Sequence, residues 1–363
     1  MKRIVIAAGG TGGHFYPGLV AAQTLKARGW QPLMIVRAHD PALPALERAD
    51  LPALPVDLRG LPRRPGPELF SFAGKLAASL GLLTRALRAF GPDLALGMGG
   101  YLSFPLVWAA WRLGVPRALH ESNAVLGLAN AAGARLGARL FWGLPPEGDA
   151  RGGVVVGTPV RPELRARRDR AQARRELGLG SDSPVVLAFG GSQGAQALNA
   201  ALPVALARLP RVEILHLAGR GKAAAAVEAY RAAGARAIVR EYLEDMAAAY
   251  AAADLVVCRA GASTLAELAA QRAPAVLIPY PHAAADHQDA NARAFERAGA
   301  CVRLPETHID RLGATLSDLL ESPGGARKRD EMASRYDALG LPPAQSAAET
   351  LADALERAAL AHA

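Results

Sequence analysis

The chain has 363 residues, of which 51% are apolar and 5% aromatic, and its formal net charge is +9. This length exceeds what one ordinary hydrophobic core serves and predicts two domains of roughly 150 to 200 residues each. The start, MKRIVIAAGG, has too short an apolar run for a secretory signal. The most apolar longer stretch, residues 69–90, contains Lys75, Arg85 and Arg88, which disfavours a membrane span. We therefore expect a cytoplasmic α/β protein.

The excess positive charge lies in the first part of the chain. Residues 1–157 contain 17 Lys and Arg against 9 Asp and Glu, and the remaining residues contain 25 against 24. No basic run alternates with aromatic residues, as a surface that stacks nucleic-acid bases usually shows. A basic region with apolar neighbours suits an anionic membrane or a lipid phosphate at least as well, so no nucleic-acid partner is expected. Cys258 and Cys301 lie in apolar segments and are predicted to be reduced core residues.

In the first half, short apolar runs alternate with helical patterns, which is typical of βαβ units and a parallel sheet. Strands are predicted at Arg3–Ala8, Pro32–Arg37, Asp93–Gly97, Arg117–His120 and Val154–Val156. Helices are predicted at Pro17–Arg28, Glu68–Phe90, Phe104–Leu113 and Leu126–Leu136. This half is therefore expected to form one doubly wound domain.

The same pattern begins again after a charged stretch at Arg165–Arg175. Further strands are predicted at Val185–Phe189, Glu213–Leu217, Ala237–Val239, Leu255–Cys258, Ala275–Ile278 and Cys301–Leu304. A hinge is expected near Gly157–Glu163, and the final helix, Gln345–Leu360, could pack back across it. Because sheets of this kind bind ligands at the carboxyl ends of their strands, the loops at those ends are the candidate sites.

Four glycine-rich turns each follow a predicted strand and precede a predicted helix. They are GGTGGH (9–14), GMGGY (97–101), GGSQGA (190–195) and RAGASTLAE (259–267). Unhindered backbone N–H groups and the positive end of a helix converge at such a turn, which makes it a seat for phosphate. In the third turn, Ser192 could add a hydroxyl to that site. Alternatively, the glycines only permit tight strand-to-helix turns.

None of these turns has the pattern of a standard nucleotide site. Phe15 occupies the last glycine position of GxGxxG, and GxxxxGK[ST] does not occur. A nicotinamide-dependent dehydrogenase and a P-loop enzyme are therefore disfavoured. Asp-x-Asp pairs, which hold metal ions, are also absent, so we expect no metal site and no cofactor. Helix ends and arginines would then meet the charge of a diphosphate.

Two polar groups in the first half are candidates for chemistry. His14 ends the first turn, where an imidazole could take a proton from an attacking hydroxyl near neutral pH. It could instead cap the helix or bind a phosphate. In LHESN, His120 and Glu121 end a strand and are interpreted as a buried ion pair that supports the loop. Asn123 is better placed to contact a sugar.

The second half offers a carboxylate and a group of amides. Glu267 is expected in the first turn of the helix after RAGAS, where the helix dipole favours a carboxylate. It could also accept both hydroxyls of a ribose. His287, Gln288 and Asn291 lie at a loop-to-helix junction, and amides suit sugar hydroxyls because they both donate and accept. Solvated polar residues at a helix start would give the same pattern.

One segment, Arg59–Leu76, mixes basic and large apolar residues. Its members are Arg59, Arg63, Arg64 and Lys75 together with Leu61, Leu69, Phe70 and Phe72. Such a patch can hold anionic headgroups through its charges while the apolar side chains enter the interface. The alternative is a solvated loop followed by a helix that faces the core.

Taken together, these motifs resemble those of the MurG family of glycosyltransferases in peptidoglycan synthesis. The order and approximate spacing agree for GGTGGH, GMGGY, LHESN, GTPVR, GGSQGA, YLEDMAAAYAAADLVVCRAGASTLAE and HQDANA, over nearly the whole chain. The resemblance implies the GT-B fold, in which two Rossmann-like domains face a cleft and the last helix returns to the first domain. It implies an N-terminal acceptor and membrane-facing domain at 1–160 with 342–363, and a C-terminal domain that binds the UDP-sugar at 161–341.

The implied reaction is an inverting, metal-independent transfer of N-acetylglucosamine. The donor would be UDP-N-acetylglucosamine, and the acceptor would be the C4 hydroxyl of the muramoyl sugar of lipid I, the undecaprenyl-pyrophosphoryl-muramoyl peptide. The product would be lipid II. The resemblance also implies a peripheral position on the cytoplasmic side of the cell membrane, against an anionic surface.

The resemblance further implies the roles of individual residues. Donor contacts would come from Thr11, Gly12, Gly13 and Asn123, with Arg161 and Ser192 near the diphosphate. The uracil would lie against the backbone around Leu243, the ribose on Glu267 within a stretch that also contains Ala262, Ser263, Thr264, Leu265 and Ala266, and the acetylated sugar near Gln288. The acceptor pyrophosphate would bind the first-half glycine turns, including Gly99, Gly100 and Tyr101. His14 would be the catalytic base.

The chain also departs from the family at several positions. Ser122 stands where glutamine is frequent, and Thr158 stands where asparagine is common. HQ replaces the QQ pair of some members, which leaves the role of His287 open. A sugar-nucleotide epimerase of the same fold is the nearest alternative function, and it would need neither a lipid acceptor nor the basic and apolar patch.

Overall fold

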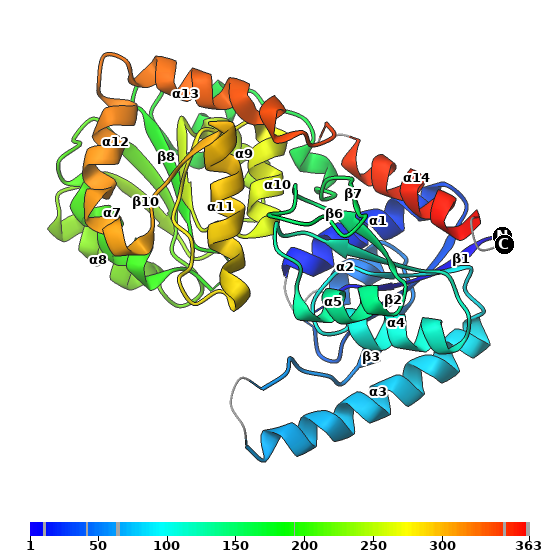
Figure 1. The fold of residues 1–363 in the computed structure, drawn as a ribbon. Helices are drawn as coiled ribbons and strands as arrows, with labels where there is room; N and C mark the ends of the chain where they lie inside the picture. Colours follow the sequence, from blue (N-terminus) through cyan, green and yellow to red (C-terminus); the bar gives the residue numbers. More distant parts are fainter. Residues whose placement is uncertain (10–11, 41–42, 63–65, 192, 344–345, 361–363) are drawn as a thin grey trace. The chain divides into compact units, whose positions relative to one another are not determined.

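The computed structural model describes residues 1–9, 12–40, 43–62, 66–191, 193–343 and 346–360. The chain divides into two compact units, residues 1–161 with 341–363 and residues 162–340 (Figure 1). Arg161 and Leu341, which the sequence assigned to the second domain, belong to the first unit. Each unit is built on one parallel sheet.

The first unit has a seven-stranded sheet with the strand order β3-β2-β1-β4-β5-β6-β7. Its elements in chain order are β1 (Arg3–Ala7), α1 (Gly12–Ala27), β2 (Gln31–Arg37), α2 (Leu43–Arg48), β3 (Ala53–Val56), α3 (Glu68–Phe90), β4 (Leu94–Gly97), α4 (Ser103–Arg112), β5 (Arg117–Glu121), α5 (Leu128–Arg135), β6 (Arg139–Trp142), β7 (Val154–Val155) and α14 (Ala347–Leu360). The central strands β1 and β4 are buried along nearly their whole length, as expected when helices cover both faces of a parallel sheet.

The structure corrects three features of the prediction for this unit. Strand β3 (Ala53–Val56) was missed because it contains Pro55, and the structure places it at an edge of the sheet, where a missing N–H is tolerated. Strand β6 (Arg139–Trp142) was missed because its apolar run is only three residues long. Helix α1 begins at Gly12 rather than at Pro17, so His14 lies within the first helical turn.

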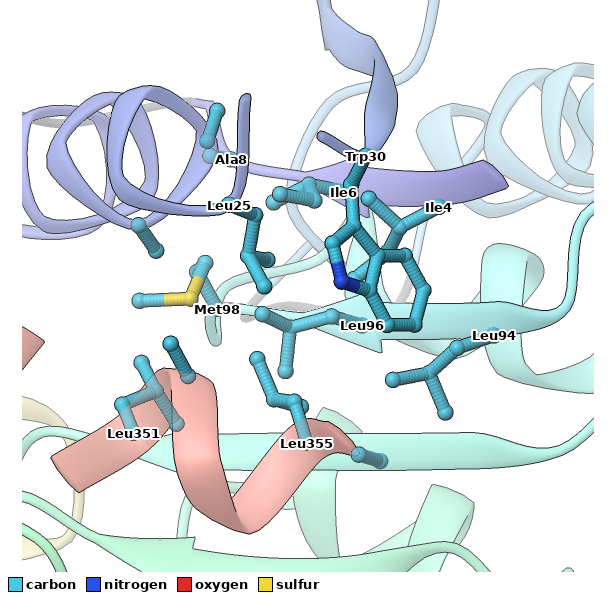
Figure 2. Packing of buried hydrophobic residues seen from close by; sticks show 14 of the residues in the cluster. Ile4, Ile6, Ala8, Leu25, Trp30, Leu94, Leu96, Met98, Leu351 and Leu355 are labelled. Carbon is cyan, nitrogen blue, oxygen red and sulfur yellow. The ribbon is translucent and has the colours of Figure 1, made fainter. Parts of the chain in front are cut away.

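The C-terminal helix α14 packs into the core of the first unit. Leu351 and Leu355 are fully buried in the same cluster as Leu96 and Met98, and Figure 2 shows their side chains pointing toward the sheet. Arg28, the residue after the end of α1, forms ion pairs with three acids of α14, Glu349, Asp353 and Glu356. The expected return of the last helix to the first domain is thus confirmed.

The second unit has a six-stranded sheet with the order β10-β9-β8-β11-β12-β13. Its strands and α-helices are α6 (Arg170–Leu177), β8 (Val185–Phe189), α7 (Gln196–Leu206), β9 (Glu213–Leu217), α8 (Ala223–Ala232), β10 (Ala237–Arg240), α9 (Met246–Ala252), β11 (Leu255–Cys258), α10 (Ala262–Gln271), β12 (Ala275–Leu277), α11 (His287–Ala298), β13 (Cys301–Arg303), α12 (Leu312–Leu320) and α13 (Gly325–Ser334). Its 3₁₀ helices are η1 (Pro162–Leu164), η2 (Ala284–Asp286), η3 (Glu306–Arg311) and η4 (Arg335–Leu339).

The six strands predicted for this half are all confirmed to within one residue at each end. Cys258 ends β11 and Cys301 begins β13, and both are buried and unpaired, as the sequence predicts. Burial raises the pKa of the Cys258 thiol well above its ordinary value, so no thiolate forms near neutral pH. Both thiols therefore act as small apolar core groups.

Candidate active site

The four glycine turns lie at equivalent places in the two sheets. In the first sheet the strand order reverses between β1 and β4, and GGTGGH and GMGGY follow these two strands. In the second sheet the order reverses between β8 and β11, and GGSQGA and RAGAS follow those two. Ligands of open parallel sheets bind at this switch point, beyond the carboxyl ends of the strands. The two units therefore each present one candidate binding edge, built by the turns that the sequence singled out.

In the first unit, His14 lies directly against the second glycine turn. A Cβ atom on Gly99 would fall 2.8 Å from His14 Cδ2 and 3.0 Å from Nε2, and a Cβ on Gly100 would fall 3.2 Å from Nδ1. Both glycines also have positive φ angles, +95° and +72°. Only glycine satisfies both conditions without strain. The turn thus provides the surface on which the half-buried imidazole rests.

The backbone of Gly99 is less open than the sequence suggested. Its N–H donates a hydrogen bond to Ser103 Oγ (2.9 Å), and the Ser103 hydroxyl donates to the Gly99 carbonyl (2.9 Å). Ser103 is fully buried in the first turn of α4. The N–H group of Gly99 is therefore already paired within the protein, unlike the unhindered groups that the sequence predicts for such a turn.

Tyr101 is half-buried and is accompanied by a cation that the sequence did not reveal. Burial raises the pKa of Tyr101, while the charge of Arg37 and its hydrogen bond lower it in part. Arg37 is the last residue of β2, next to β1, and its backbone nitrogen would lie 3.0 Å from a Cβ on Gly9. Arg37 therefore stands beside both glycine turns of the first unit. In the sequence, only the position of Arg37 at the end of a predicted strand indicated that it could lie near these turns.

His120 and Glu121 form no ion pair, so that prediction is wrong, although both are buried as expected. His120 Nε2 donates to the Gly157 carbonyl (2.9 Å), and Ser122 Oγ contacts Nδ1 (3.3 Å). Burial lowers the pKa of His120, with a smaller contribution from His14, against the opposing effects of Gly157 and Glu121. The ring is therefore neutral and structural.

Glu121 organises the loop that follows β5. Its carboxylate accepts four hydrogen bonds at 2.9–3.0 Å, from the backbone and side-chain amides of Asn123, from the Gly127 N–H and from Asn130 Nδ2. Only 3% of the Glu121 surface is exposed. The carboxylate thus fixes the amide of Asn123, which is half-buried at the carboxyl edge of the sheet.

In the second unit, the turn after β8 is held by close backbone contacts. A Cβ on Gly194 would lie 2.0 Å from the Ala218 carbonyl oxygen, and one on Gly219 would lie 2.4 Å from the Gly194 nitrogen. Lys222 Nζ donates to the Gln193 carbonyl (2.7 Å). Glycine is required here for close packing of two loops, and Ser192 lies outside the described residues.

The same turn borders a cavity of about 690 Å³ within the second unit. Its polar lining includes Arg259, Tyr280, Gln288 and Glu306, which come from loops after β11, β12 and β13 and from the start of α11. Helix α7 also begins at this cavity, and its N-cap residue, Ala195, has no side chain that can accept from the first N–H groups. A helix start of this kind favours an anion.

Arg259 is the main cation that lines this cavity. It is the first residue of the turn RAGASTLAE, and no role was predicted for it from the sequence. Only 8% of its surface is exposed. Its guanidinium donates to the carbonyls of Ile278 and Pro279 (3.2 and 3.1 Å), forms an ion pair with Glu306, and lies 5.4 Å from the centre of the Tyr280 ring. Gln288 belongs to the same wall because its Oε1 accepts from the Tyr280 N–H (3.0 Å).

Glu267 lies in the second turn of α10, so the predicted first-turn position is wrong. The capping explanation for this acid therefore fails, since the dipole effect decays within the first turn. The first turn instead contains Ala262, Ser263 and Thr264, all half-buried, while Leu265 and Ala266 are buried and Glu267 is half-buried. Its Oε2 accepts a hydrogen bond from the Tyr250 hydroxyl (3.0 Å).

The remaining candidate residues are distributed as follows. Leu243 is half-buried in the loop between β10 and α9. The guanidinium of Arg161 lies 5.2 Å from the centre of the Tyr16 ring, within the first unit. His287 begins α11, and its Nδ1 donates to the Ala284 carbonyl (2.7 Å). Gly12 and Gly13 lie in the first turn of α1, and Thr11 lies outside the described residues.

The basic and apolar segment is only partly exposed. Phe70, Leu61 and Leu69 are 84%, 57% and 37% exposed, and Arg59 is also exposed. Phe72 packs instead against a core cluster of the first unit, and Lys75 Nζ pairs with Asp57 Oδ2 (2.9 Å). Arg63 and Arg64 lie outside the described residues. Sequence reasoning missed Trp111, which is 46% exposed on α4, the helix packed against α3.

No described group of three or more His, Cys, Asp or Glu side chains is arranged to hold a metal ion. Among the helices that the structure describes, none combines the length and the apolar character needed to cross a bilayer.

Comparison with known proteins agrees with this architecture. Residues 4–141 match the glycosyltransferase family 28 N-terminal domain, and residues 185–351 match the family 28 C-terminal domain. A relative from Alkalilimnicola ehrlichii is 40% identical over 94% of this chain and 95% of its own length. One from Aeromonas hydrophila is 38% identical over 99% and 97%. Both are named UDP-N-acetylglucosamine–N-acetylmuramyl-(pentapeptide) pyrophosphoryl-undecaprenol N-acetylglucosamine transferase.

The crystal structure of MurG from Acinetobacter baumannii superposes with a TM-score of 0.79 at 30% identity, over 98% of this chain and all of that one. The two Rossmann-like units therefore have the GT-B fold that the motifs implied. The two segments that match the family models contain all four glycine turns. The chain belongs to glycosyltransferase family 28 and, within it, to the MurG family of enzymes.

Proposed function

We propose that this enzyme transfers N-acetylglucosamine from UDP-N-acetylglucosamine to the C4 hydroxyl of the muramoyl sugar of lipid I, which produces lipid II for peptidoglycan synthesis. The observation that carries the proposal is the placement of all four glycine turns at the two switch points, in a chain 38–40% identical to transferases named for that reaction. A fold alone would leave the substrate open, because many chemistries share it.

The donor nucleotide is proposed to bind the second unit. Its cavity combines the start of α7 with the buried cation Arg259, a pairing that suits a diphosphate. Glu267 would accept the two ribose hydroxyls, Gln288 would contact the acetylated sugar, and the backbone at Leu243 would face the uracil. Ser192 would add a hydroxyl near the diphosphate. Thr11, Gly12, Gly13, Asn123 and Arg161 are the first-unit residues proposed to complete the donor contacts.

The acceptor is proposed to bind the first unit. Its pyrophosphate would lie at the glycine turns, where Gly100 and Tyr101 adjoin the cation Arg37. Gly99 would contribute through its close contact with His14 rather than through its own N–H, which already donates to Ser103. His14 would then stand beside the acceptor sugar.

The proposed chemical step is a single displacement. His14 accepts the proton of the C4 hydroxyl as that oxygen bonds to the anomeric carbon of the donor sugar, and the bond from this carbon to the UDP oxygen breaks. Attack from the side opposite to UDP converts the α-linked donor sugar to a β-linked product. The negative charge that develops on UDP would be met by the starts of α7 and α10 and by Arg259, so no divalent ion is required.

The enzyme is proposed to act at the cytoplasmic side of the cell membrane. Arg59 and the exposed Leu61, Leu69 and Phe70 give this surface both charge and apolar side chains for an anionic bilayer. Trp111 on the adjacent helix α4 extends the exposed apolar surface of this unit. Nucleic acid is not among the proposed partners, because the positive charge is not interleaved with aromatic side chains.

Dependence on the acceptor tests the proposal. UDP release from UDP-N-acetylglucosamine is measured with and without a soluble lipid I analogue. The proposal predicts release only when the analogue is present. Turnover of the UDP-sugar without any acceptor would instead identify a sugar-nucleotide epimerase.

A further inference from the structure

A buried tyrosine lies behind the carboxylate that is proposed to bind the ribose. Tyr250 is on α9 and only 4% of its surface is exposed. Its hydroxyl lies 3.0 Å from Glu267 Oε2, on the neighbouring helix α10. Sequence reasoning selected Glu267 but not Tyr250, because 17 residues separate them and only the fold brings them together.

The Tyr250 hydroxyl donates this hydrogen bond and the Glu267 carboxylate accepts it. Burial and the charge of Glu267 raise the pKa of Tyr250 well above its ordinary value. The phenol therefore keeps its proton near neutral pH and donates the hydrogen bond to the carboxylate oxygen, which accepts it. The ring has little freedom to turn away, because it packs edge-on against Phe189 of β8 at a centroid separation of 6.2 Å. The donor is thus held in one position.

This contact determines how the carboxylate is presented. Glu267 is half-buried, and a glutamate in such a position has three rotatable bonds before its oxygens are placed. A fixed donor on one oxygen selects one orientation of the carboxylate plane before any ligand arrives. Preorganisation of this kind reduces the entropy lost on binding. It also lowers the number of rotamers from which the ligand must select.

We propose that Tyr250 is a positioning residue for the donor nucleotide: its hydroxyl holds the Glu267 carboxylate in the orientation that accepts the 2′ and 3′ hydroxyls of a ribose. The inference rests on the proposed function, in which Glu267 binds the ribose. It adds that the selection of ribonucleotides depends on a side chain that does not touch the ligand. Tyr250→Phe removes the hydroxyl that donates to Glu267 and leaves the ring in place.

The test compares the binding of UDP and 2′-deoxy-UDP by calorimetry. Tyr250→Phe is expected to weaken UDP binding about three- to tenfold, the range for one buried hydrogen bond. Binding of 2′-deoxy-UDP, which lacks one of the two hydroxyls, is expected to weaken less, so the preference for UDP shrinks. In a Glu267→Ala background, the additional Phe substitution is expected to have no effect on UDP binding.

Tyr230→Phe is the matched control. Tyr230 is 2% exposed in the same unit, and its hydroxyl contacts His216 Nδ1 at 3.0 Å rather than Glu267. This variant also loses one buried hydrogen bond and is expected to leave the affinities for both nucleotides unchanged. Thermal unfolding of the two variants shows whether their folds are equally affected.

The outcomes separate the inference from the function on which it rests. If Glu267→Ala weakens UDP binding and Tyr250→Phe does not, the positioning role is overturned and the ribose role stands. If Tyr250→Phe weakens both nucleotides equally, its effect is general and the inference is also overturned. A wild-type enzyme that does not bind UDP contradicts the proposed function itself. Should Tyr250→Phe fail to fold, a crystal structure of the wild-type enzyme with UDP replaces it: a Glu267 carboxylate that accepts from the ribose hydroxyls while the Tyr250 hydroxyl lies outside hydrogen-bond distance of it overturns the positioning role.

Discussion

The imidazole of His14 rests on the backbone of Gly99, so closely that a Cβ at Gly99 would lie 2.8 Å from His14 Cδ2. This contact joins the turns after β1 and β4 at the switch point of the first sheet. It explains why a glycine is needed at Gly99 for two independent reasons, its φ of +95° and the absence of space. A substitution at Gly99 can therefore displace the His14 ring without any change to His14 itself.

Gly99→Ala is predicted to lower turnover by displacing the His14 ring. The expected effect is at least about tenfold on kcat, because a general base contributes about 10² to 10⁴ in rate and depends on its geometry. His14→Ala should reproduce this pattern, with kcat reduced more than the apparent affinity for lipid I. If both variants change only the KM for the acceptor, His14 is a ligand of the lipid phosphate rather than the base.

Gly114→Ala provides the control for backbone strain. Gly114 has a φ of +71° in the same unit, and a Cβ there meets nothing within 4 Å. Alanine at either position is expected to cost about 1–2 kcal/mol of unfolding free energy through the left-handed backbone alone. Only Gly99→Ala should affect kcat. Equal kinetic effects of the two substitutions would show that the His14 contact is irrelevant.

Glu121→Gln is predicted to destabilise the first unit. An amide in place of the carboxylate offers one acceptor oxygen, whereas four N–H donors converge on Glu121. The NH₂ group of the glutamine then faces the two N–H donors that bonded to the replaced oxygen. Each buried group left without a partner costs about 1–3 kcal/mol. All four tryptophans, Trp30, Trp108, Trp111 and Trp142, belong to this unit, so tryptophan fluorescence in a urea titration follows its unfolding selectively.

Asp50→Asn is the comparison for that experiment. It also replaces a carboxylate by an amide in the first unit, but the Asp50 side chain is 97% exposed and forms an ion pair with the exposed cation Lys26. Exposed pairs contribute little to stability, so its unfolding curve should match that of the wild type. A Glu121→Gln curve that also matches would contradict the structural role assigned to the buried carboxylate.

Phe70→Ser is predicted to weaken the binding of the enzyme to vesicles that contain anionic phospholipid. Phe70 is 84% exposed and contributes almost nothing to the core, so its removal should leave the fold intact. Loss of one inserted phenylalanine is expected to weaken binding by about tenfold or more. Val204→Ser, at a residue 67% exposed on α7 of the second unit, should sediment with the vesicles as the wild type does. Equal sedimentation of Phe70→Ser and wild type would exclude this surface from the membrane contact.

The second unit is predicted to lose stability as the pH falls from 6.5 toward 4. Burial lowers the pKa of His216 from its ordinary value of 6.5 to about 4. Between these values the unfolded chain binds a proton that the folded chain does not, so unfolding becomes more favourable as the pH falls. The expected slope is about 1.4 kcal/mol for each pH unit. This slope applies fully only below pH 6.5. It ends near pH 4, where His216 of the folded protein also binds a proton.

His216→Leu should flatten this dependence. Scanning calorimetry at pH 6.5 and pH 4.5 measures it in both proteins. The lowered pKa of His120 adds a similar trend in the first unit, so the variant is expected to retain part of the pH effect. An unchanged difference between the two pH values would show that His216 is not the group that resists protonation.

The sequence predicted most of the fold because parallel strands covered on both faces are continuous apolar runs. This holds for Val185–Phe189 and Leu255–Cys258, whose bounds were predicted without error. It fails for Ala53–Val56, where a proline interrupts the run, and for Arg139–Trp142, where only three apolar residues remain. Pairing with neighbours across the sheet decides these short strands, and no local pattern records it.

The candidate site was predictable in its location but less so in its contacts. The glycine turns mark the switch points because tight turns and close approaches require glycine, a property visible in the residues. The partners of the key side chains were not visible. Tyr250 behind Glu267, Arg37 beside Tyr101 and Ser103 on Gly99 are neighbours only in the fold. The predicted ion pair of His120 with Glu121 failed because adjacent residues of a strand point to opposite faces.

The proposed transfer of N-acetylglucosamine to a lipid-linked acceptor depends on the enzyme's own cations and helix termini. It is tested most directly by incubating the enzyme with radiolabelled UDP-N-acetylglucosamine and a lipid I analogue in excess EDTA, and by measuring label in the extracted lipid. We predict that label enters the lipid at the rate seen without EDTA. Label that stays in the aqueous phase, or that enters the lipid only after a divalent cation is restored, would contradict the account.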